Sequence, residues 1–528
     1  MNKQQARIIA VLTIAAIVLG FLISRKLWFR LDLTDNKAYT ISGVSKNLYT
    51  EIPDQVRITY YVSDRLVSLH PMPGQITDLL REYAAHSHGR IRLTVRDPAK
   101  ANLVQTVEEL GILGQQIETV EQDEASVAVV YSGILIEYLD NAEVLPVVFS
   151  LDTLEYDLTS RIRALIRGTE REAGVLVGSA NRQWASDYGY LNQAFYQAGF
   201  KIRLINPGEE ISDTLPVLIV LGGAEYLDEW SLYRIDRYIQ GGGKVLFALE
   251  AVEVGTENGL EAQVITDQGL LSMVSFYGAT VKPELVLDRS ALTIPVQGRG
   301  GTIRLVRYPH FVSVLEQYGN PSHPISAGFG GVDLFWASPI DFTLPAGVEG
   351  TVLFTSTPEA WLMTRDFVID TEAASYAFSR EELDTRGTKV LAAALSGKFP
   401  AWFAGVPKPV REGSGEELPD LPREAQESRI VVIGDTDLGS GYIQYTRSQR
   451  NLDFLIQAAD WLSNDDDIIG IRNRENQTGR LDRIVEPEKR LAAIGFSRIL
   501  NVVILPLLVI IAGLLIALRR KQSFLKDK

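Results

Sequence analysis

The sequence predicts an α/β protein with a doubly wound, mostly parallel sheet. From about residue 174, short continuous apolar runs alternate with amphipathic stretches of helical length. Uninterrupted apolar strands are typical of a sheet that helices cover on both faces. The same alternation returns after residue 428. Hydrophobic residues make up 46% of the 528 positions and charged residues 22%, a balance that predicts folded domains rather than disorder.

The region from residue 31 to 150 predicts a separate α+β domain. Alternation predicts strands at Val56 to Val62 and Ile91 to Val95, and a helical stripe runs from Gln75 to Ala85 between them. A helix is predicted at Ala101 to Leu110, and antiparallel strands at Ser126 to Tyr131, Ile134 to Tyr138 and Glu143 to Phe149. A βαβ unit followed by antiparallel strands is compatible with a thioredoxin-like layer. The chain has no cysteine, so CxxC redox chemistry is excluded.

The doubly wound domain follows a connecting helix predicted at Leu154 to Ile166. Strands are predicted at Gly174 to Val177, Lys201 to Ile205, Leu215 to Leu221 and Lys244 to Leu249. Helices are predicted at Tyr188 to Ala198 and Glu229 to Gln240. After a charged Pro/Gly-rich stretch, the pattern resumes with a strand at Arg429 to Ile433 and a helix at Asn451 to Ser463.

These elements predict a discontinuous domain between two membrane anchors. The predicted division is an N-terminal anchor (1–30), an α+β domain (31–150), a connecting helix (151–170), an α/β domain (171–403) with an insertion at about 251–345, a charged loop (404–428), the return of the α/β domain (429–475), a juxtamembrane segment (476–498), a C-terminal transmembrane helix (499–518) and a basic tail (519–528).

Two apolar segments predict the anchors. Ile8 to Ile23 contains no charged residue, and Ile499 to Leu518 is apolar except for Asn501; stretches of this kind are typical of membrane spans. Five cations follow the second segment: Arg519, Arg520, Lys521, Lys526 and Lys528. Cations of this kind favour the cytoplasmic side. We therefore expect a two-pass protein with both termini in the cytoplasm and an extracytoplasmic middle.

Charge and motifs exclude several function classes. The net charge of −14 argues against a basic nucleic-acid surface. The chain contains neither a P-loop nor a GxSxG motif, which argues against an ATPase and a serine hydrolase. The close pair His86 and His88 does not form a zinc-binding HExxH.

The weak candidates for a chemical site are Asp435 and Asp437, directly after the strand that ends at Ile433. Ligands of open α/β sheets bind beyond the carboxyl ends of the strands, and two carboxylates could share a hard cation there. A turn or capping role is the favoured interpretation, because Asp commonly bonds to the backbone two residues further on. No catalytic residue and no cofactor is predicted.

Several segments together resemble a known family. They are the N-terminal apolar segment, Asp32 to Ser42 (DLTDNKAYTIS), Leu154 to Ser160 (LEYDLTS), Arg429 to Asp437 (RIVVIGDTD), Asn451 to Leu462, Ile469 to Arg472 and the C-terminal apolar segment. The set resembles the GldG-like auxiliary components of gliding-motility-associated ABC transport systems. The doubly wound domain also resembles glutamine-amidotransferase-like folds, whose nucleophile is a cysteine that this chain lacks.

The resemblance implies a non-enzymatic auxiliary or substrate-binding subunit that works with a separate ABC permease and a separate ATP-binding subunit. It implies a place in a bacterial inner membrane, contact with the lipid bilayer and a periplasmic domain that could bind a cell-envelope ligand. Two alternatives stay open: a membrane-tethered, metal-dependent hydrolase of envelope material that uses Asp435 and Asp437, and a structural envelope scaffold.

Overall fold

The computed structural model describes residues 41–121, 124–151, 154–168, 171–179, 182–223, 226–255, 260–266, 269–297, 302–327, 329–371, 383–411, 417–446, 449–463 and 471. All of them belong to one compact unit, Ile41–Asn476.

The first part of this unit contains a four-stranded sheet in the order β2-β1-β5-β6. Its strands are β1 (Val56–Val62), β2 (Ile91–Arg96), β5 (Ser132–Tyr138) and β6 (Asn141–Leu145), and its helices are α2 (Gly43–Glu51), α3 (Asp64–Leu69), α4 (Met72–His86), α5 (Val104–Glu109) and α6 (Leu154–Arg167). β1 and β2 are parallel, whereas β5 is antiparallel to both β1 and β6. The thioredoxin-like assignment of this layer stays a prediction.

One strand of this region differs from the prediction. β4 (Glu124–Val130) pairs with β3 (Gln115–Glu121) in a separate two-stranded ribbon and does not join the sheet. β3 was not predicted, because its sequence QQIETVE is rich in polar residues and lacks an apolar face.

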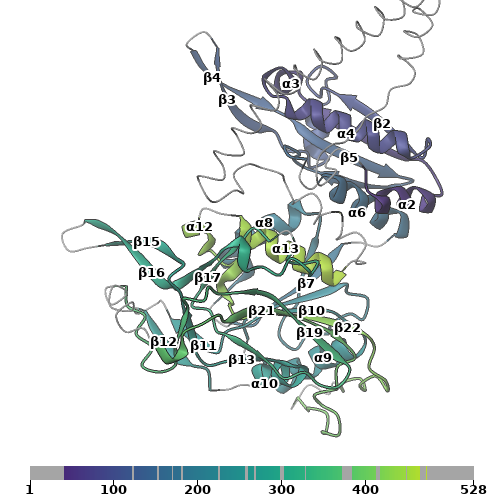
Figure 1. Cartoon of the computed structure of the whole chain (residues 1–528). Coiled ribbons are helices and arrows are strands. Elements are labelled where there is room, and N and C mark those ends of the chain that lie inside the picture. Colours follow the sequence, from purple (N-terminus) through teal and green to yellow (C-terminus); the bar gives the residue numbers. More distant parts are fainter. Residues whose placement is uncertain are drawn as a thin grey trace, which may run out of the picture. The chain divides into compact units, whose positions relative to one another are not determined.

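The second part contains a seven-stranded sheet in the order β19-β21-β22-β10-β9-β7-β8 (Figure 1). Its strands are β7 (Glu172–Val177), β8 (Lys201–Leu204), β9 (Val217–Leu221), β10 (Val245–Ala248), β19 (Val348–Thr355), β21 (Val390–Gly397) and β22 (Ser428–Ile433). The helices of the α/β pattern are α7 (Trp184–Asp187), α8 (Gly189–Gln197), α9 (Glu229–Gln240), α12 (Ile443–Thr446) and α13 (Arg450–Ser463), with a 3-10 turn η4 (Asp437–Gly439).

The sheet is mixed rather than purely parallel. The five strands from β8 to β22 are parallel, as predicted. β21 is antiparallel to β22, and β19 is antiparallel to β21. The sequence of β21, VLAAALSG, has small residues that give no strand signal, although the strand is buried in the sheet.

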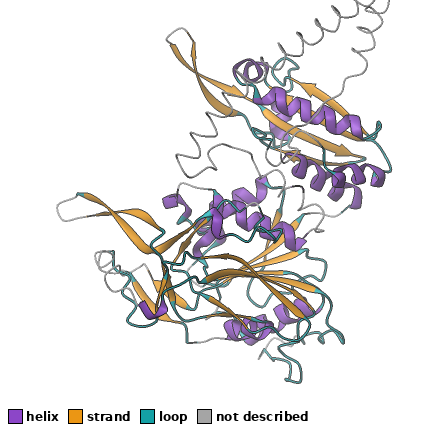
Figure 2. Ribbon diagram, viewed as in Figure 1, coloured by secondary structure: helices purple, strands orange, loops and turns teal. Residues whose placement is uncertain are grey.

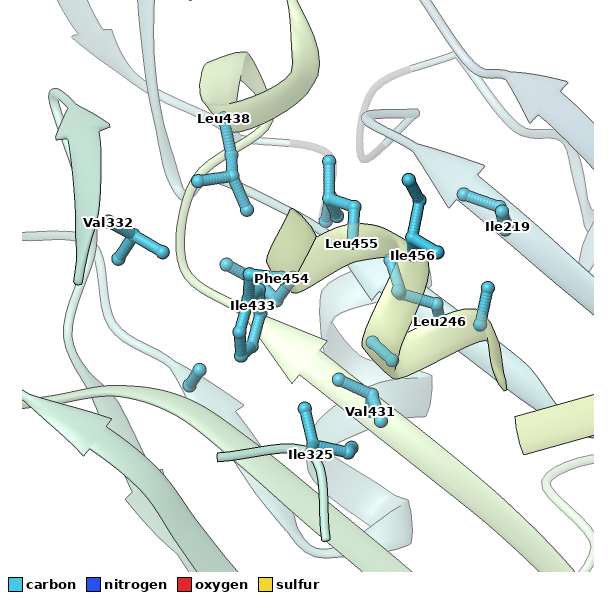
Figure 3. Packing of buried hydrophobic residues seen from close by; sticks show 14 of the residues in the cluster. Ile219, Leu246, Ile325, Val332, Val431, Ile433, Leu438, Phe454, Leu455 and Ile456 are labelled. Carbon is cyan, nitrogen blue, oxygen red and sulfur yellow. The ribbon is translucent and has the colours of Figure 1, made fainter. Parts of the chain in front are cut away.

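Both faces of this sheet are buried, which explains the uninterrupted apolar strands. In β22, Val431 and Ile433 pack in one hydrophobic cluster with residues of α13, while Val432 packs in a second cluster on the other face. Figure 3 shows Ile433 beside Phe454 of α13, with Val431 further along the same strand. The second cluster includes residues of α9 and of α10 (Gly269–Tyr277). Helices therefore cover the sheet on two sides, as in a doubly wound arrangement.

The segment predicted as an insertion forms small sheets (Figure 2), part of which packs in a separate hydrophobic cluster that includes Tyr308 and Phe311. Its strands are β11 (Val252–Gly255), β12 (Glu261–Val264), β13 (Ala279–Val281), β14 (Leu285–Leu287), β15 (Ala291–Gln297), β16 (Ile303–Val314), β17 (Val332–Phe335) and β18 (Ile340–Phe342), with the 3-10 turn η2 (Glu316–Tyr318) between β16 and β17. Later in the chain follow β20 (Trp361–Met363) and the 3-10 turn η3 (Leu383–Thr385). β15, β16 and β17 form a three-stranded sheet, and β14 pairs with β20.

Two segments that carry the family resemblance contact each other in the first part of the unit. The buried Glu155 of α6 accepts hydrogen bonds from the backbone N–H of Ser42 at 2.7 Å and from the Ser45 hydroxyl at 2.6 Å. The Ser45 and Thr159 hydroxyls are 2.8 Å apart. Ser42 also caps the N-terminus of α2 by accepting from the backbone N–H of Ser45. Residues more than one hundred positions apart therefore form one buried polar network.

The described structure corrects the predicted localisation. Within the described ranges, no helix is both long and apolar enough to cross a bilayer. α4 has 15 residues, whereas a membrane span needs about 20 consecutive apolar residues. The segments predicted as spans, Ile8 to Ile23 and Ile499 to Leu518, lie outside the described residues. The finding contradicts the two-pass inner-membrane assignment.

The core of the small sheets contains a buried histidine that predicts a pH dependence. Burial lowers the pKa of His310 to about 3, whereas an unfolded histidine has a pKa near 6.5. The stability that the neutral ring contributes is complete above pH 6.5 and is lost as the pH falls toward 3. Between pH 7 and pH 5, His310 should reduce the free energy of unfolding by about 2 kcal/mol.

This dependence is measurable by comparing the parent chain with a His310→Phe variant in urea at pH 7 and pH 5. The variant should lose less stability than the parent over this interval. An exposed-histidine variant, His88→Ala, should behave as the parent does. Equal losses for the parent and His310→Phe would contradict a neutral buried ring.

Candidate functional site

A pocket of about 330 Å³ lies beyond the carboxyl ends of four parallel strands, β7, β9, β10 and β22. Residues directly after each strand, or in the loops that follow, line it. They include Ser179 and Arg182 after β7, Gly222, Gly223 and Tyr226 after β9, Glu250 after β10, Glu253 on β11, and Thr436, Ser440, Tyr442 and Tyr445 after β22. This is the position at which open α/β sheets bind ligands.

Glycines bring the strand ends close together. A Cβ added at Gly178 would lie 2.4 Å from the Cα of Gly223, so the turns after β7 and β9 are in backbone contact. Gly223 itself has a φ of +103°, which is unfavourable for residues with side chains. A Cβ at Gly434 would lie 2.0 Å from the carbonyl oxygen of Ser338. The turns that end these strands, defined here as the floor of the pocket, therefore pack main chain against main chain.

Asp435 has a structural role at this floor. The side chain is fully buried, and its Oδ2 accepts a hydrogen bond from the backbone N–H of Phe335 at 2.7 Å. Its Oδ1 accepts from the backbone N–H of Asp437 at 2.6 Å. Burial raises the pKa of Asp435 well above its ordinary value, and the nearby Asp437 carboxylate raises it further. The carboxyl group fixes the turn after β22 and joins that turn to β17.

Asp437 pairs with the arginine that lines the pocket. Its buried carboxylate forms an ion pair with the guanidinium of Arg182. Burial raises the pKa of Asp437, and the Arg182 charge opposes that rise. The Arg182 side chain is 22% exposed and Asp437 only 4%, so the guanidinium covers the carboxylate on its solvent side.

Glu250 adds a third carboxyl group. It follows β10 and lines the pocket. Burial raises the pKa of Glu250 well above its ordinary value, and the Asp437 charge raises it further while Arg182 lowers it. Ionising all three neighbouring carboxyl groups beside one guanidinium is energetically unfavourable, because like charges repel each other in a low-dielectric site. Perturbed groups of this kind, gathered in a cleft, are typical of functional sites.

The repulsion among these carboxyl groups predicts that removing one negative charge stabilises the fold. Glu250→Gln should raise the free energy of unfolding at pH 8 by about 1 kcal/mol, the usual size of the effect of a single substitution, because burial and the Asp437 charge disfavour the ionised form of Glu250. A raised folded pKa means that Glu250 destabilises the fold at high pH and that this penalty disappears as the pH falls toward 4.5. The advantage of the variant should therefore be largest at pH 8 and absent near pH 4.

Urea unfolding of both chains at pH 8 and pH 4 measures this difference. Glu253→Gln, which changes the partly exposed carboxyl group on β11, is the matched control and should change stability by less than about 0.5 kcal/mol. A Glu250→Gln variant that is destabilised at pH 8 would contradict the repulsion.

No group of three or more His, Asp or Glu that could hold a metal ion is found in the part of the chain that the structure describes. The metal-dependent hydrolase hypothesis relied on Asp435 and Asp437. Both oxygens of Asp435 already accept backbone hydrogen bonds, and Asp437 is paired with Arg182. This arrangement supplies a rigid polar floor rather than a free pair of ligands.

The sequence prediction named the strand end that carries Asp435 and Asp437 but not the other residues around the pocket. Asp435 and Asp437 lie at the strand end where they were expected, below the pocket. Arg182 was not predicted, because it lies in a loop and the sequence around it forms no recognisable motif. Glu250 could have been found, because it directly follows the apolar run that forms β10. His86 ends α4 in the other sheet region, and neither it nor His88 lines the pocket.

Comparison with family models gives two matches. Residues 170–458, more than half of the chain, match the family described as ABC-type uncharacterized transport system. This range includes every strand that ends at the pocket. Residues 35–137 match a domain of unknown function, DUF7088.

A curated relative has nearly the same length as this chain. An uncharacterized protein of Borreliella burgdorferi (strain ATCC 35210 / DSM 4680 / CIP 102532 / B31) is 25% identical over 504 residues, which is 94% of each chain. The similarity therefore spans both sheet regions.

Solved structures give weaker likenesses. The N-terminal domain of mmIFT52 is 13% identical, with a TM-score of 0.33 over 55% of this chain and 98% of that chain. A putative ThuA-like protein from Parabacteroides merdae ATCC 43184 is 12% identical, with a TM-score of 0.20 over 36% of this chain and 68% of that chain. An exo-beta-1,4-mannosidase from Opitutaceae bacterium strain TAV5 is 10% identical, with a TM-score of 0.24 over 74% of this chain and 50% of that chain. Scores of this size carry no argument about function.

Proposed function

This chain belongs to the family described as ABC-type uncharacterized transport system, and on that premise we propose that it is a non-enzymatic auxiliary subunit of an ABC-type transport complex. The family match over residues 170–458 is the observation that carries the proposal. The subunit works with a separate permease and a separate ATP-binding subunit, because its own sequence contains no P-loop. Within the family, we assign it to the GldG-like components associated with gliding motility.

The pocket beyond β7, β9, β10 and β22 is the ligand site of this subunit. Its lining combines main-chain groups of Gly222 and Gly223, hydroxyls and the Glu250 carboxyl group. A mixture of this kind binds small polar molecules by hydrogen bonds rather than by apolar contact. The ligand class is a transported substrate or a component of the cell envelope.

The chemistry of the floor supports the proposal that this subunit is non-enzymatic. Asp435 and Asp437 are engaged by backbone N–H groups and by Arg182. The sequence offers no cysteine nucleophile and no GxSxG motif. The described lining of the pocket offers hydrogen-bonding groups, which supports a subunit that recognises a ligand and leaves it unchanged.

The domain division is also a proposal. The α+β domain of residues 31–150 is thioredoxin-like, and the α/β domain of 171–403 and 429–475 is glutamine-amidotransferase-like with an insertion at about 251–345. The strand order β2-β1-β5-β6 and the five parallel strands around β10 support these two assignments.

Purification of the full-length chain from its own cells tests the transport assignment. A tagged chain is extracted in mild detergent, which keeps permease complexes intact, and the co-purifying proteins are quantified by mass spectrometry. An ABC permease and an ATP-binding subunit should be recovered in a fixed ratio to the chain and be absent from an untagged strain. Recovery of the chain without either subunit would remove the proposed function.

A further inference from the structure

Glu250 and Glu253 line the pocket beyond β7, β9, β10 and β22 without a proton donor of their own. Neither forms a hydrogen bond or an ion pair with any residue that the structure describes. The third acidic side chain of the lining does have partners. Asp187 accepts from the backbone N–H of Gln183 at 2.8 Å and from the Ser186 hydroxyl at 2.8 Å. Glu250 and Glu253 are therefore available to a ligand.

The lining of the pocket carries more negative than positive charge. Among its described residues, Asp187, Glu250 and Glu253 are acidic, and Arg182 is the only basic one. The Arg182 guanidinium is already paired with the buried carboxylate of Asp437. Like charges gathered in a low-dielectric site repel one another, and a counter-charge relieves that repulsion. The remaining space therefore favours a positively charged ligand.

Tyrosine rings line the same space. They belong to Tyr226, which is 40% exposed, to Tyr442 and to Tyr445, which is 50% exposed. The Tyr442 ring packs on Phe335 and Trp336, whose ring centroids lie 5.5 and 5.4 Å away. The face of a tyrosine ring attracts a cation that lies within about 6 Å of the ring centroid. Aromatic rings together with carboxyl groups are typical of sites that recognise ammonium ligands.

We propose that this pocket binds a small organic cation through a primary ammonium group. The ammonium lies beside the tyrosine rings and donates hydrogen bonds to Glu250 and Glu253, because such a group has several N–H donors and no acceptor. A pocket of about 330 Å³ is at the small end of ligand sites, which favours a free small molecule. The inference rests on the proposed function, because it names the chemical class of the ligand for the site assigned there.

Other ligands fit these groups less well. A metal ion needs several ligands close together, and the described residues contain no group of three or more His, Asp or Glu that could hold one. An anion would be repelled by the carboxyl groups of the lining. A neutral polyol could donate to Glu250 and Glu253 but would leave the excess negative charge uncompensated. An ammonium group supplies both the donors and the charge.

Matched ligands test the charge and the donors separately. Ligand-observed NMR titration of the purified full-length chain measures the dissociation constants of ethanolamine, ethylene glycol and choline. Ethylene glycol replaces the ammonium of ethanolamine by a neutral hydroxyl, and choline keeps the charge but has no N–H donor. Ethanolamine should bind at least about tenfold more tightly than either compound. Equal affinities for ethanolamine and either matched compound would overturn the inference.

Substitutions of the two carboxyl groups locate the ammonium. Glu250→Gln and Glu253→Gln should each weaken ethanolamine binding at least about tenfold, because each removes the charged acceptor of a hydrogen bond. Glu349→Gln makes the same change in charge on the edge strand β19, at a residue that does not line the pocket, and should leave the affinity unchanged. Thermal unfolding of each variant shows that its fold is intact. Equal losses in all three variants, or no loss in the first two, would overturn the inference.

The pH dependence of binding gives a second measurement. Burial raises the pKa of Glu250 well above its ordinary value; the charges of Asp437, Asp435 and Glu253 add to this rise, and that of Arg182 opposes it. An ammonium beside Glu250 favours the ionised carboxylate, so binding should release a proton and the affinity for ethanolamine should increase from pH 5 to pH 8. Glu250→Gln should remove most of this increase. An affinity of the parent chain that is the same at both pH values would overturn the role given to Glu250.

The same ammonium could also be presented by a lipid. Vesicles of phosphatidylethanolamine carry it on a membrane surface and should not displace ethanolamine from the chain, since the pocket is assigned to a free small molecule. Displacement by the vesicles would overturn that assignment.

The two proposals fail in different ways. If the permease and the ATP-binding subunit co-purify with the chain but ethanolamine binds no better than ethylene glycol, the ligand class fails and the proposed function stands. If ethanolamine binds as expected but neither subunit co-purifies, the proposed function fails and the chemistry of the pocket stands.

Discussion

Replacing Asp460 with alanine is expected to lower the free energy of unfolding by about 3–5 kcal/mol, because it leaves a buried arginine unpaired. Asp460 of α13 forms an ion pair with Arg171, and the two side chains are only 1% and 8% exposed. Arg171 also donates to the carbonyl oxygen of Ala198 at 2.6 Å and lies 4.4 Å from the ring centroid of Phe200. One guanidinium therefore joins the end of α13, the end of α8 and the start of β7.

Urea unfolding of the full-length chain measures this loss. Asp453→Ala changes an exposed carboxylate on the same helix and should cost less than about 1 kcal/mol. The double variant Arg171→Met with Asp460→Leu should lose less stability than Asp460→Ala alone, because the unpaired buried charge is then absent. A loss below about 1 kcal/mol for Asp460→Ala would contradict the role given to the pair.

The second large effect is expected at Glu155. Its side chain is 2% exposed and accepts hydrogen bonds from Ser42 and Ser45. Hydrogen bonds to a charged group contribute about 1.5–3 kcal/mol each, so Glu155→Ala should cost about 3 kcal/mol or more. The substitution also leaves the Ser42 N–H without its acceptor at the start of α2, and the helix end should loosen.

Thermal unfolding together with amide exchange in α2 tests this expectation. Glu155→Gln keeps an acceptor oxygen and should lose about half as much stability as the alanine variant. Glu51→Ala, at the exposed end of α2, is the matched control and should change stability by less than about 0.5 kcal/mol. A Glu155→Ala variant as stable as the control would show that the network does not hold α2 in place.

The polar networks explain why short segments carried the family resemblance. Asp460 lies in the Asn451 to Leu462 segment, and Glu155 in LEYDLTS, which contacts the end of DLTDNKAYTIS. At the start of the first of these segments, Asn451 donates to the carbonyl oxygens of Asp333 and Leu438 at 2.7 and 3.0 Å. These residues hold distant segments together, so the motifs report a shared fold rather than a shared reaction.

The buried parallel strands could be predicted from the sequence, because a continuous apolar run is typical of a strand whose two faces are both buried. β9 and β10 are buried along their whole length, and their positions match the predicted runs. β3 and β21 could not be predicted, because one is polar and the other is made of small residues. Their strand conformation comes from pairing with a neighbour, which a local pattern does not contain.

The sequence by itself determined the α/β class, the doubly wound alternation, the absence of cysteine and P-loop chemistry, and the strand end at Asp435 and Asp437. These properties depend on local composition and spacing. The tertiary structure decided that Arg182 pairs with Asp437, that the charge of Asp437 acts on Glu250, and that both carboxylate oxygens of Asp435 accept backbone hydrogen bonds. Long-range contacts bring together residues from loops with no common pattern, and only folding in three dimensions specifies which charges are buried side by side.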